Sequence, residues 1–161
     1  MWLMGFSAQV IADLQKLWFR LDPANKLKVC KRGFWAYSRH PNYFGEMAMW
    51  WGIFISSAVL WRDHHPDGYA SIVSPLFTML IILFLSGMPT AERDGLKRYY
   101  TSGDELRNSY VAYRARIAPI VPCSPPLYSA LPIPMKQACC CEFPCYEFNS
   151  EQQPLTAAVV T

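Results

Sequence analysis

A ten-residue stretch from Tyr37 to Glu46 gathers the side chains of this sequence that are best suited to chemistry. It contains Arg39, His40 and Asn42 before the closing Glu46, and it runs directly into an apolar segment. Cationic, amide and carboxylate groups each cost several kcal/mol when they are buried without a partner. Something that pairs with this cluster is therefore expected beside it.

The local order of these residues indicates a helix N-terminus. Pro41 is expected in the first helical turn, where its missing N–H is no loss. Asn42 and Glu46 are four residues apart, so their side chains share one face. A helix start that follows Arg39 and His40 also favours a bound anion. The alternative is a belt of aromatic and Arg anchors at a membrane surface, where such residues are common.

The composition of the chain favours a membrane protein over a soluble one. Its 161 residues are enough for one domain, and 52% of them are hydrophobic while only 17% are charged. Soluble domains are usually about a quarter charged. A formal net charge of +3 is too small to indicate nucleic acid as a partner.

Two apolar segments, residues 43–61 and 69–88, are each long enough to cross a bilayer, which takes about 20 helical residues. Residues 1–20 have apolar side chains at helical spacing and read as a helix in or near the membrane, or as an amphipathic helix with its polar face in water. Residues 90–117 are polar and predict amphipathic helices. The predicted fold is an all-α integral membrane bundle with about two to three membrane helices.

Basic residues are concentrated on one side of the two apolar segments. Five precede the first segment and six follow the second, whereas Arg62 stands alone between them; the eleven are Lys26, Lys28, Lys31, Arg32, Arg39, Arg93, Lys97, Arg98, Arg107, Arg114 and Arg116. The positive-inside rule predicts that this side is cytosolic. The bilayer itself is thus an expected partner.

The C-terminal part changes in character. Residues 123–161 are rich in Pro and Cys and show no helical period, so they predict a disordered tail after a domain of residues 1–122. S-palmitoylation of Cys139, Cys140 and Cys141 is a better functional prediction than zinc binding, since no paired CxxC spacing is present; unmodified thiols remain the alternative. His64 and His65 predict a solvated turn, and no metal site is expected.

The string from Phe34 to Glu46 as a whole resembles the C-terminal domain of the steroid 5-alpha-reductase family. The resemblance covers about residues 1–122. It implies a helical membrane protein, expected in the endoplasmic reticulum, that reduces the carbon–carbon double bond of a steroid, sterol or related lipid enone with NADPH.

The resemblance also implies where NADPH binds. Asn42 and Glu46 match an Asn-x3-Glu that looks like the contact to the nicotinamide amide, while Gln9 stands where an Asn or Glu is usual. The residues expected to bind the cofactor are Asp13, Arg20, Arg39, His40, Asn42, Tyr43, Glu46, Glu92, Arg93 and Tyr99. No catalytic residue is assigned.

Two other hypotheses stay open. In the family, the groups that polarise the substrate carbonyl come from helices before the region seen here, so the chain resembles a cofactor half-site, which fits a fragment or a non-catalytic membrane remnant. The Arg-His-Pro core is also similar to that of isoprenylcysteine carboxyl methyltransferases, which use S-adenosylmethionine. The pair of Asn42 and Glu46 favours the reductase.

Overall fold

A computed structural model describes residues 1–61 and 66–146, and its regular elements are helical, which confirms the all-α class. An isolated parallel bridge joins Ser38 and Ala118. The α-helices are α1 (Trp2–Leu21), α2 (Pro41–Trp61), α3 (Val73–Leu80), α4 (Met88–Tyr100), α5 (Asp104–Arg116), α6 (Pro125–Ala130) and α7 (Ile133–Cys140). Shorter turns of helix are η1 (Pro23–Asn25), η2 (Gly33–Ala36), η3 (Pro66–Ile72), the π-helical η4 (Ile81–Leu85) and η5 (Pro144–Tyr146).

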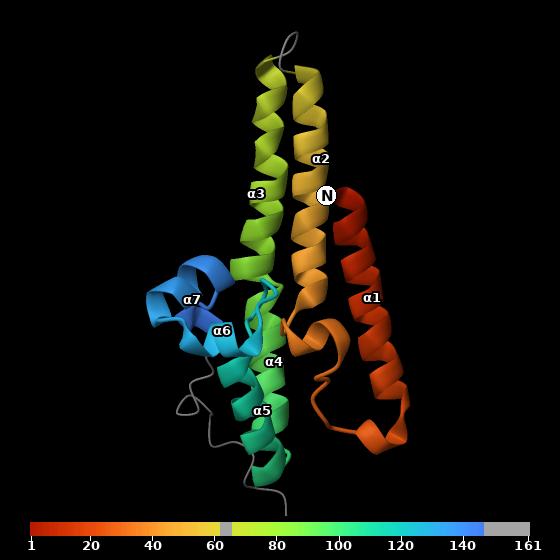
Figure 1. The fold of residues 1–161 in the computed structure, drawn as a ribbon, viewed down its shortest axis with the longest axis vertical. Helices are drawn as coiled ribbons and strands as arrows, with labels where there is room; N and C mark the ends of the chain where they lie inside the picture. The colour runs from red at the N-terminus through yellow and green to blue at the C-terminus, as the bar shows by residue number, and fades with distance from the viewer. Residues whose placement is uncertain (62–65, 147–161) are drawn as a thin grey trace, which may run out of the picture.

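The helices form an elongated bundle around one long hairpin. α2 and α3 run antiparallel, and α1 packs along the N-terminal part of α2 (Figure 1). α4, α5 and the segment that contains η2 lie at the end of the bundle where α2 begins, which we call the polar end (Figure 1). α6 and α7 lie beside the junction of α3 and α4 (Figure 1). The Arg39–His40 motif, which directly precedes α2, therefore lies at the polar end together with α4 and α5.

Close packing of α1 on α2 depends on three glycines. A Cβ atom on Gly45 would lie 2.6 Å from the Gly5 carbonyl oxygen, and one on Gly5 would lie 2.6 Å from the Gly45 carbonyl oxygen. At Gly52 a Cβ would meet the backbone nitrogen of Trp2 at 2.6 Å. Small residues let two helix backbones approach in this way. Gly45 in the sequence motif thus has a packing role.

Within the described residues, one helical stretch, Asp67–Tyr100, is long and apolar enough to cross a membrane. Val73, Phe77 and Leu80 are exposed along its apolar part, so lipid rather than protein is a suitable neighbour for them. The stretch becomes polar in α4, beyond Met88. This supports a helical protein with one candidate membrane helix.

The predicted disorder of the C-terminal tail is wrong for residues 123–146. α6, α7 and η5 form there, and Tyr128, Cys140 and Tyr146 are among the most buried side chains. Pro125, Pro126 and Pro134 stand in the first turns of α6 and α7, where no N–H is needed. Residues 147–161 lie outside the described part of the chain, as do His64 and His65 with the turn predicted for them.

We predict that Gly45→Ala lowers stability by about 2–4 kcal/mol, because its methyl group would meet backbone atoms of α1 that cannot turn away. The measurement is the midpoint of thermal unfolding in detergent. Ser56→Ala, at an exposed position on α2, is the control and should change the midpoint little. Equal midpoints for the two variants would contradict the close approach of the helices.

Candidate functional site

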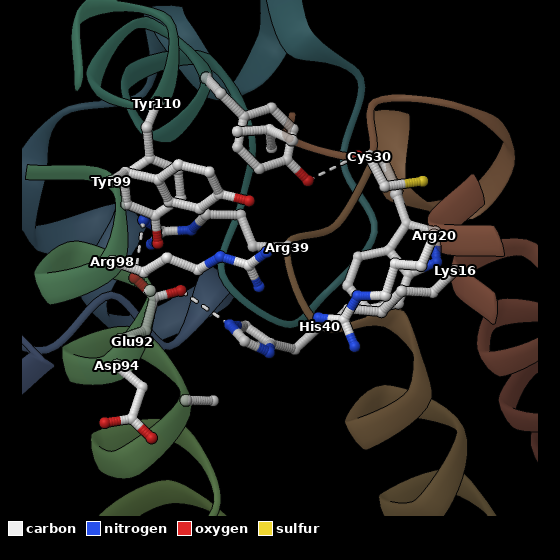
Figure 2. Close-up of a pocket in the computed structure, with 15 residues that line it drawn as sticks. Lys16, Arg20, Cys30, Arg39, His40, Glu92, Asp94, Arg98, Tyr99 and Tyr110 are labelled. Carbon is white, nitrogen blue, oxygen red and sulfur yellow. Dashed lines mark hydrogen bonds and ion pairs between the residues drawn. The ribbon is translucent and has the colours of Figure 1, made fainter. Parts of the chain in front are cut away.

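The centre of the polar end is the carboxylate of Glu92, which is 0% exposed. Its Oε1 lies 2.7 Å from His40 Nε2, and its Oε2 lies 3.3 Å from Arg39 Nη1 and 3.2 Å from Arg114 Nε. Figure 2 shows Glu92 on α4 facing His40 and Arg39. One acidic side chain thereby joins the start of α2 to α4 and α5.

Backbone hydrogen bonds hold the motif in place. The amides of Arg39 and His40 donate to the carbonyls of Ala118 and Pro119 at 2.8 and 3.0 Å, as in a short piece of sheet. The Ser38 hydroxyl donates to the Ile120 carbonyl at 2.7 Å. Every one of these groups is buried, so the pairing meets the requirement that buried polar groups find partners.

Tyr113 fixes the same segment from α5. Its hydroxyl donates to the Trp35 carbonyl at 2.7 Å. Burial raises the pKa of Tyr113 well above its usual value, so the hydroxyl stays protonated and remains a donor. Trp35 in turn donates from Nε1 to the Ala12 carbonyl of α1 at 2.9 Å. The motif is consequently connected to α1 as well as to α5.

The protonation states in this network follow from burial and charge. Burial raises the pKa of the Glu92 carboxyl, but Arg39, His40 and Arg114 outweigh that effect and lower it to about 2. Burial lowers the pKa of His40, and this exceeds the opposing effect of Glu92. His40 is therefore neutral, with Nε2–H donating to the ionised carboxylate.

A cavity of about 280 Å³ opens beside this network, between the end of α1, the segment before α2, and α4 and α5. Lys16, Arg20 and Arg98 line it, and none of the ion pairs between described residues involves these three cations. Lys16 and Arg20 face the cavity from the side opposite Glu92 and Arg98 (Figure 2). An anion would complete this set of charges.

Aromatic rings form much of the remaining wall of this cationic cavity. Tyr99 and Tyr110 stack with their centroids 4.5 Å apart, and Lys16 Nζ lies 4.1 Å from the centre of the Trp35 ring. Flat aromatic surfaces next to unpaired cations suit a ligand that combines phosphate with a planar ring.

A second cavity, of about 550 Å³, lies between α2 and α3 and is lined mainly by apolar residues of both helices. Tyr43 and Glu46 bring polar groups to it. The rings of Tyr43 and His40 stack with centroids 5.3 Å apart, and His40 lines the cationic cavity. This stacked pair therefore stands between the two cavities.

The residues predicted to bind the cofactor divide into three groups in the structure. Arg20, Arg39, His40, Glu92 and Tyr99 line the cationic cavity, while Tyr43 and Glu46 line the apolar one. The third group, Asp13, Asn42 and Arg93, lines neither cavity.

Asn42 stands between these two sets in the sequence, and its Oδ1 is buried without a hydrogen-bond partner in the described structure. Glu46 accepts a hydrogen bond from Gln9 Nε2 at 2.8 Å, which occupies one of its oxygens. Asp13 and Arg93 are exposed on α1 and α4.

The sequence reading missed several residues of the site. Lys16 was read only as part of the helix of residues 1–20, and Arg98 and Arg114 as part of the basic flank and of the polar helices that follow the second apolar segment. The spacing of Lys16 and Arg20, four residues apart, was the available signal that they share a face. Nothing in the sequence indicated that Glu142, 103 residues from Arg39, would pair with it at 2.9 Å.

Comparison with known proteins supports a family assignment. A family model described as a protein of unknown function (DUF1295) matches residues 1–117. The chain belongs to the DUF1295 family. No curated protein and no solved structure matches it.

Residues 1–117 contain the whole cationic cavity of this DUF1295 protein, and all three partners of Glu92. Glu142 and the helices α6 and α7 lie beyond the matched region. Within residues 1–61 and 66–146 no group of three or more His, Cys, Asp or Glu residues is placed to hold a metal ion. The cationic cavity is lined by cations, by aromatic rings and by the carboxylates of Glu92 and Asp94.

We predict that Glu92→Gln destabilises the protein by about 3–5 kcal/mol, because it removes the carboxylate that buried Arg39 shares with half-buried Arg114. Chemical denaturation followed by Trp fluorescence measures the effect. Glu105→Gln removes the same charge from an exposed position on α5 and should cost less than about 1 kcal/mol. Similar losses for the two variants would mean that Glu92 does not hold the helices together.

The pH dependence of stability should report His40. Folding lowers the pKa of His40, so below about pH 6.5 His40 binds a proton in the unfolded chain but not in the folded protein. Stability therefore falls as the pH decreases from 7.5 to 5. Glu92, with its lowered pKa, adds a further loss below about pH 4.3. Thermal unfolding midpoints from about pH 7.5 down to about pH 3 measure both effects, and His40→Gln should flatten the part between pH 7.5 and 5. An unchanged slope in His40→Gln would contradict a neutral buried His40.

Proposed function

We propose that this protein is a membrane reductase domain that binds NADPH in the cationic cavity and reduces a carbon–carbon double bond of a steroid, sterol or related lipid enone. The observation that carries the proposal is the set of Lys16, Arg20 and Arg98 around one cavity, without carboxylate partners in the described structure. Together with Arg39 these residues give the cavity lining four cations against two carboxylates, Glu92 and Asp94. A phosphate-bearing ligand supplies the missing negative charge.

The chain's residues fit the phosphate-bearing half of NADPH. Arg98 and Arg20 offer planar guanidinium groups, which suit bidentate contacts to phosphate, and Lys16 offers a third cation. Tyr99 and Tyr110 supply stacked aromatic surface in the same cavity. At about 280 Å³ the cavity suits part of a dinucleotide, so the rest of the cofactor is expected to extend past His40 toward α2.

Asn42 fits the nicotinamide half. Its buried Oδ1 lacks a donor, and the amide of a nicotinamide ring carries one. When bound, NADPH supplies the hydride that reduces the double bond. The role of the chain would be to bind and orient the ring beside Tyr43, at the edge of the apolar cavity.

The apolar cavity between α2 and α3 is the proposed site for the lipid substrate. Trp50, Phe77 and Ile81 line it, with Ser74 and Thr78 as hydroxyl groups among them. A mostly apolar lining with a few polar groups is typical of sites that bind a sterol-sized ligand. We assign no catalytic acid.

The proposed setting is the endoplasmic reticulum membrane with the cationic cavity on the cytosolic side. In this arrangement α2 is a second membrane helix beside the Asp67–Tyr100 stretch, and α1 packs against it through Gly5 and Gly45. The basic residues before α2 and after α3 would then lie on the same cytosolic side, where NADPH is supplied.

S-palmitoylation would add a lipid anchor at the C-terminal segment, and the exposure of the three thiols supports one of them as the acceptor. Cys139 is exposed on α7, whereas Cys140 is buried and Cys141 is half-buried. An acyltransferase needs an accessible thiol, so Cys139 is the proposed acceptor among them.

We predict that Arg98→Gln weakens NADPH binding by about tenfold or more, because it removes one of the unpaired cations. Titration calorimetry of the purified protein in detergent measures the dissociation constant. Lys97→Gln, one residue away and exposed outside the cavity, is the matched control and should bind as the wild type does. The same titration with S-adenosylmethionine tests the methyltransferase hypothesis, which tighter binding of that ligand than of NADPH would favour. No NADPH binding by the wild type would refute the proposed function.

We predict that Asn42→Ala also weakens NADPH binding, and that it does so without altering the binding of inorganic pyrophosphate. The reason is that Asn42 lies outside the residues that line the cationic cavity and would contact only the nicotinamide half. Parallel titrations with the two ligands separate these effects. Equal loss for both ligands would instead indicate a general disturbance of the site.

A further inference from the structure

We propose that Glu142 restrains anion binding in the cationic cavity by neutralising Arg39 from the opposite side. Arg39 lines that cavity, and its side chain is only 2% exposed. Its Nη2 pairs with Glu142 Oε1 at 2.9 Å, and its Nη1 lies 3.3 Å from Glu92. The inference rests on the proposed function only in naming NADPH as the anion.

The guanidinium of Arg39 retains unused donors. Its Nε and Nη1 have no hydrogen-bond partner of good geometry among the described residues, although both atoms are buried. A buried donor without an acceptor is costly, and it gains from any acceptor that reaches it. Arg39 is consequently a site where an incoming phosphate oxygen could bind, in competition with the two carboxylates.

The charges of the buried network are balanced only because Glu142 takes part. Arg39 and Arg114 are matched by Glu92 and Glu142, and His40 is neutral. Without the Glu142 charge the network would carry one positive charge, beside a cavity lining in which Lys16, Arg20 and Arg98 outnumber the one further carboxylate, Asp94. The cavity would then attract an anion more strongly, especially at low ionic strength.

Glu142 belongs to a segment that packs firmly onto the domain but lies outside the family match, which ends at residue 117. Phe143 contacts Phe84 with ring centroids 5.2 Å apart, and Tyr146 is 1% exposed in the core with Met88 and Ile120. These contacts place the carboxylate beside Arg39. Detachment of the segment would remove a charge from the site without changing any residue of the cavity.

The test is binding of NADPH and of inorganic pyrophosphate to the full chain in detergent at 50 and 300 mM NaCl. Glu142→Gln keeps the shape of the side chain and should bind both ligands roughly five- to tenfold more tightly at the lower salt concentration, with a smaller gain at the higher. Glu105→Gln, which removes an exposed charge, should bind within about twofold of the wild type.

If Glu142→Gln does not fold, a second variant provides the test. Phe143→Ala keeps the carboxylate but removes its aromatic anchor, and it should give a smaller gain in the same direction. NADPH binding by the wild type with no gain in either variant overturns the inference and leaves the proposed function standing. Pyrophosphate binding that tightens in Glu142→Gln, without NADPH binding, supports the inference and refutes the proposed function. If the wild type and the variants bind neither ligand, both fail.

Discussion

The structure depends on one buried carboxylate with three cationic or hydrogen-bonding partners. Glu92 comes from α4, and its partners come from the residues before α2 and from α5, so a single side chain holds three parts of the fold at one point. An ionised group without solvent is stable only when nearby charges replace the lost hydration. Arg39, His40 and Arg114 replace that hydration and keep the pKa of the Glu92 carboxyl low. This need for partners explains why arginine and histidine stand together ahead of an apolar helix.

This arrangement changes how the motif is understood. Arg39 and His40 were expected to bind a ligand directly, yet each already interacts with Glu92. Both residues line the cationic cavity, and Arg39 keeps donors without a partner, while Lys16, Arg20 and Arg98 form no ion pair among the described residues. The exposed positions of Asp13 and Arg93 give them no part in the cavity of this structure.

Much of the fold could be predicted from the sequence because its signals are local. Apolar length predicted the helices of the hairpin, and Pro41 lies at the start of α2 as expected. The ordered C-terminal segment could not be predicted, since Tyr146 packs in a core cluster with distant residues such as Met47 and Met88, while Tyr128 and Cys140 pack around Ala118. For the site, the sequence indicated Arg39, His40 and Glu92 but not their mutual pairing, which depends on how α4 and α5 pack.

The central claim is that the polar end of the hairpin binds a dinucleotide beside the Glu92 network. Hydrogen–deuterium exchange of the intact protein in detergent, with and without NADPH, tests it most directly because it locates the ligand without any substitution. If NADPH binds there, exchange should slow in residues 28–40 and 91–100, which contain most of the residues that line the cationic cavity. Protection confined to other segments, or no protection by saturating NADPH, would contradict it.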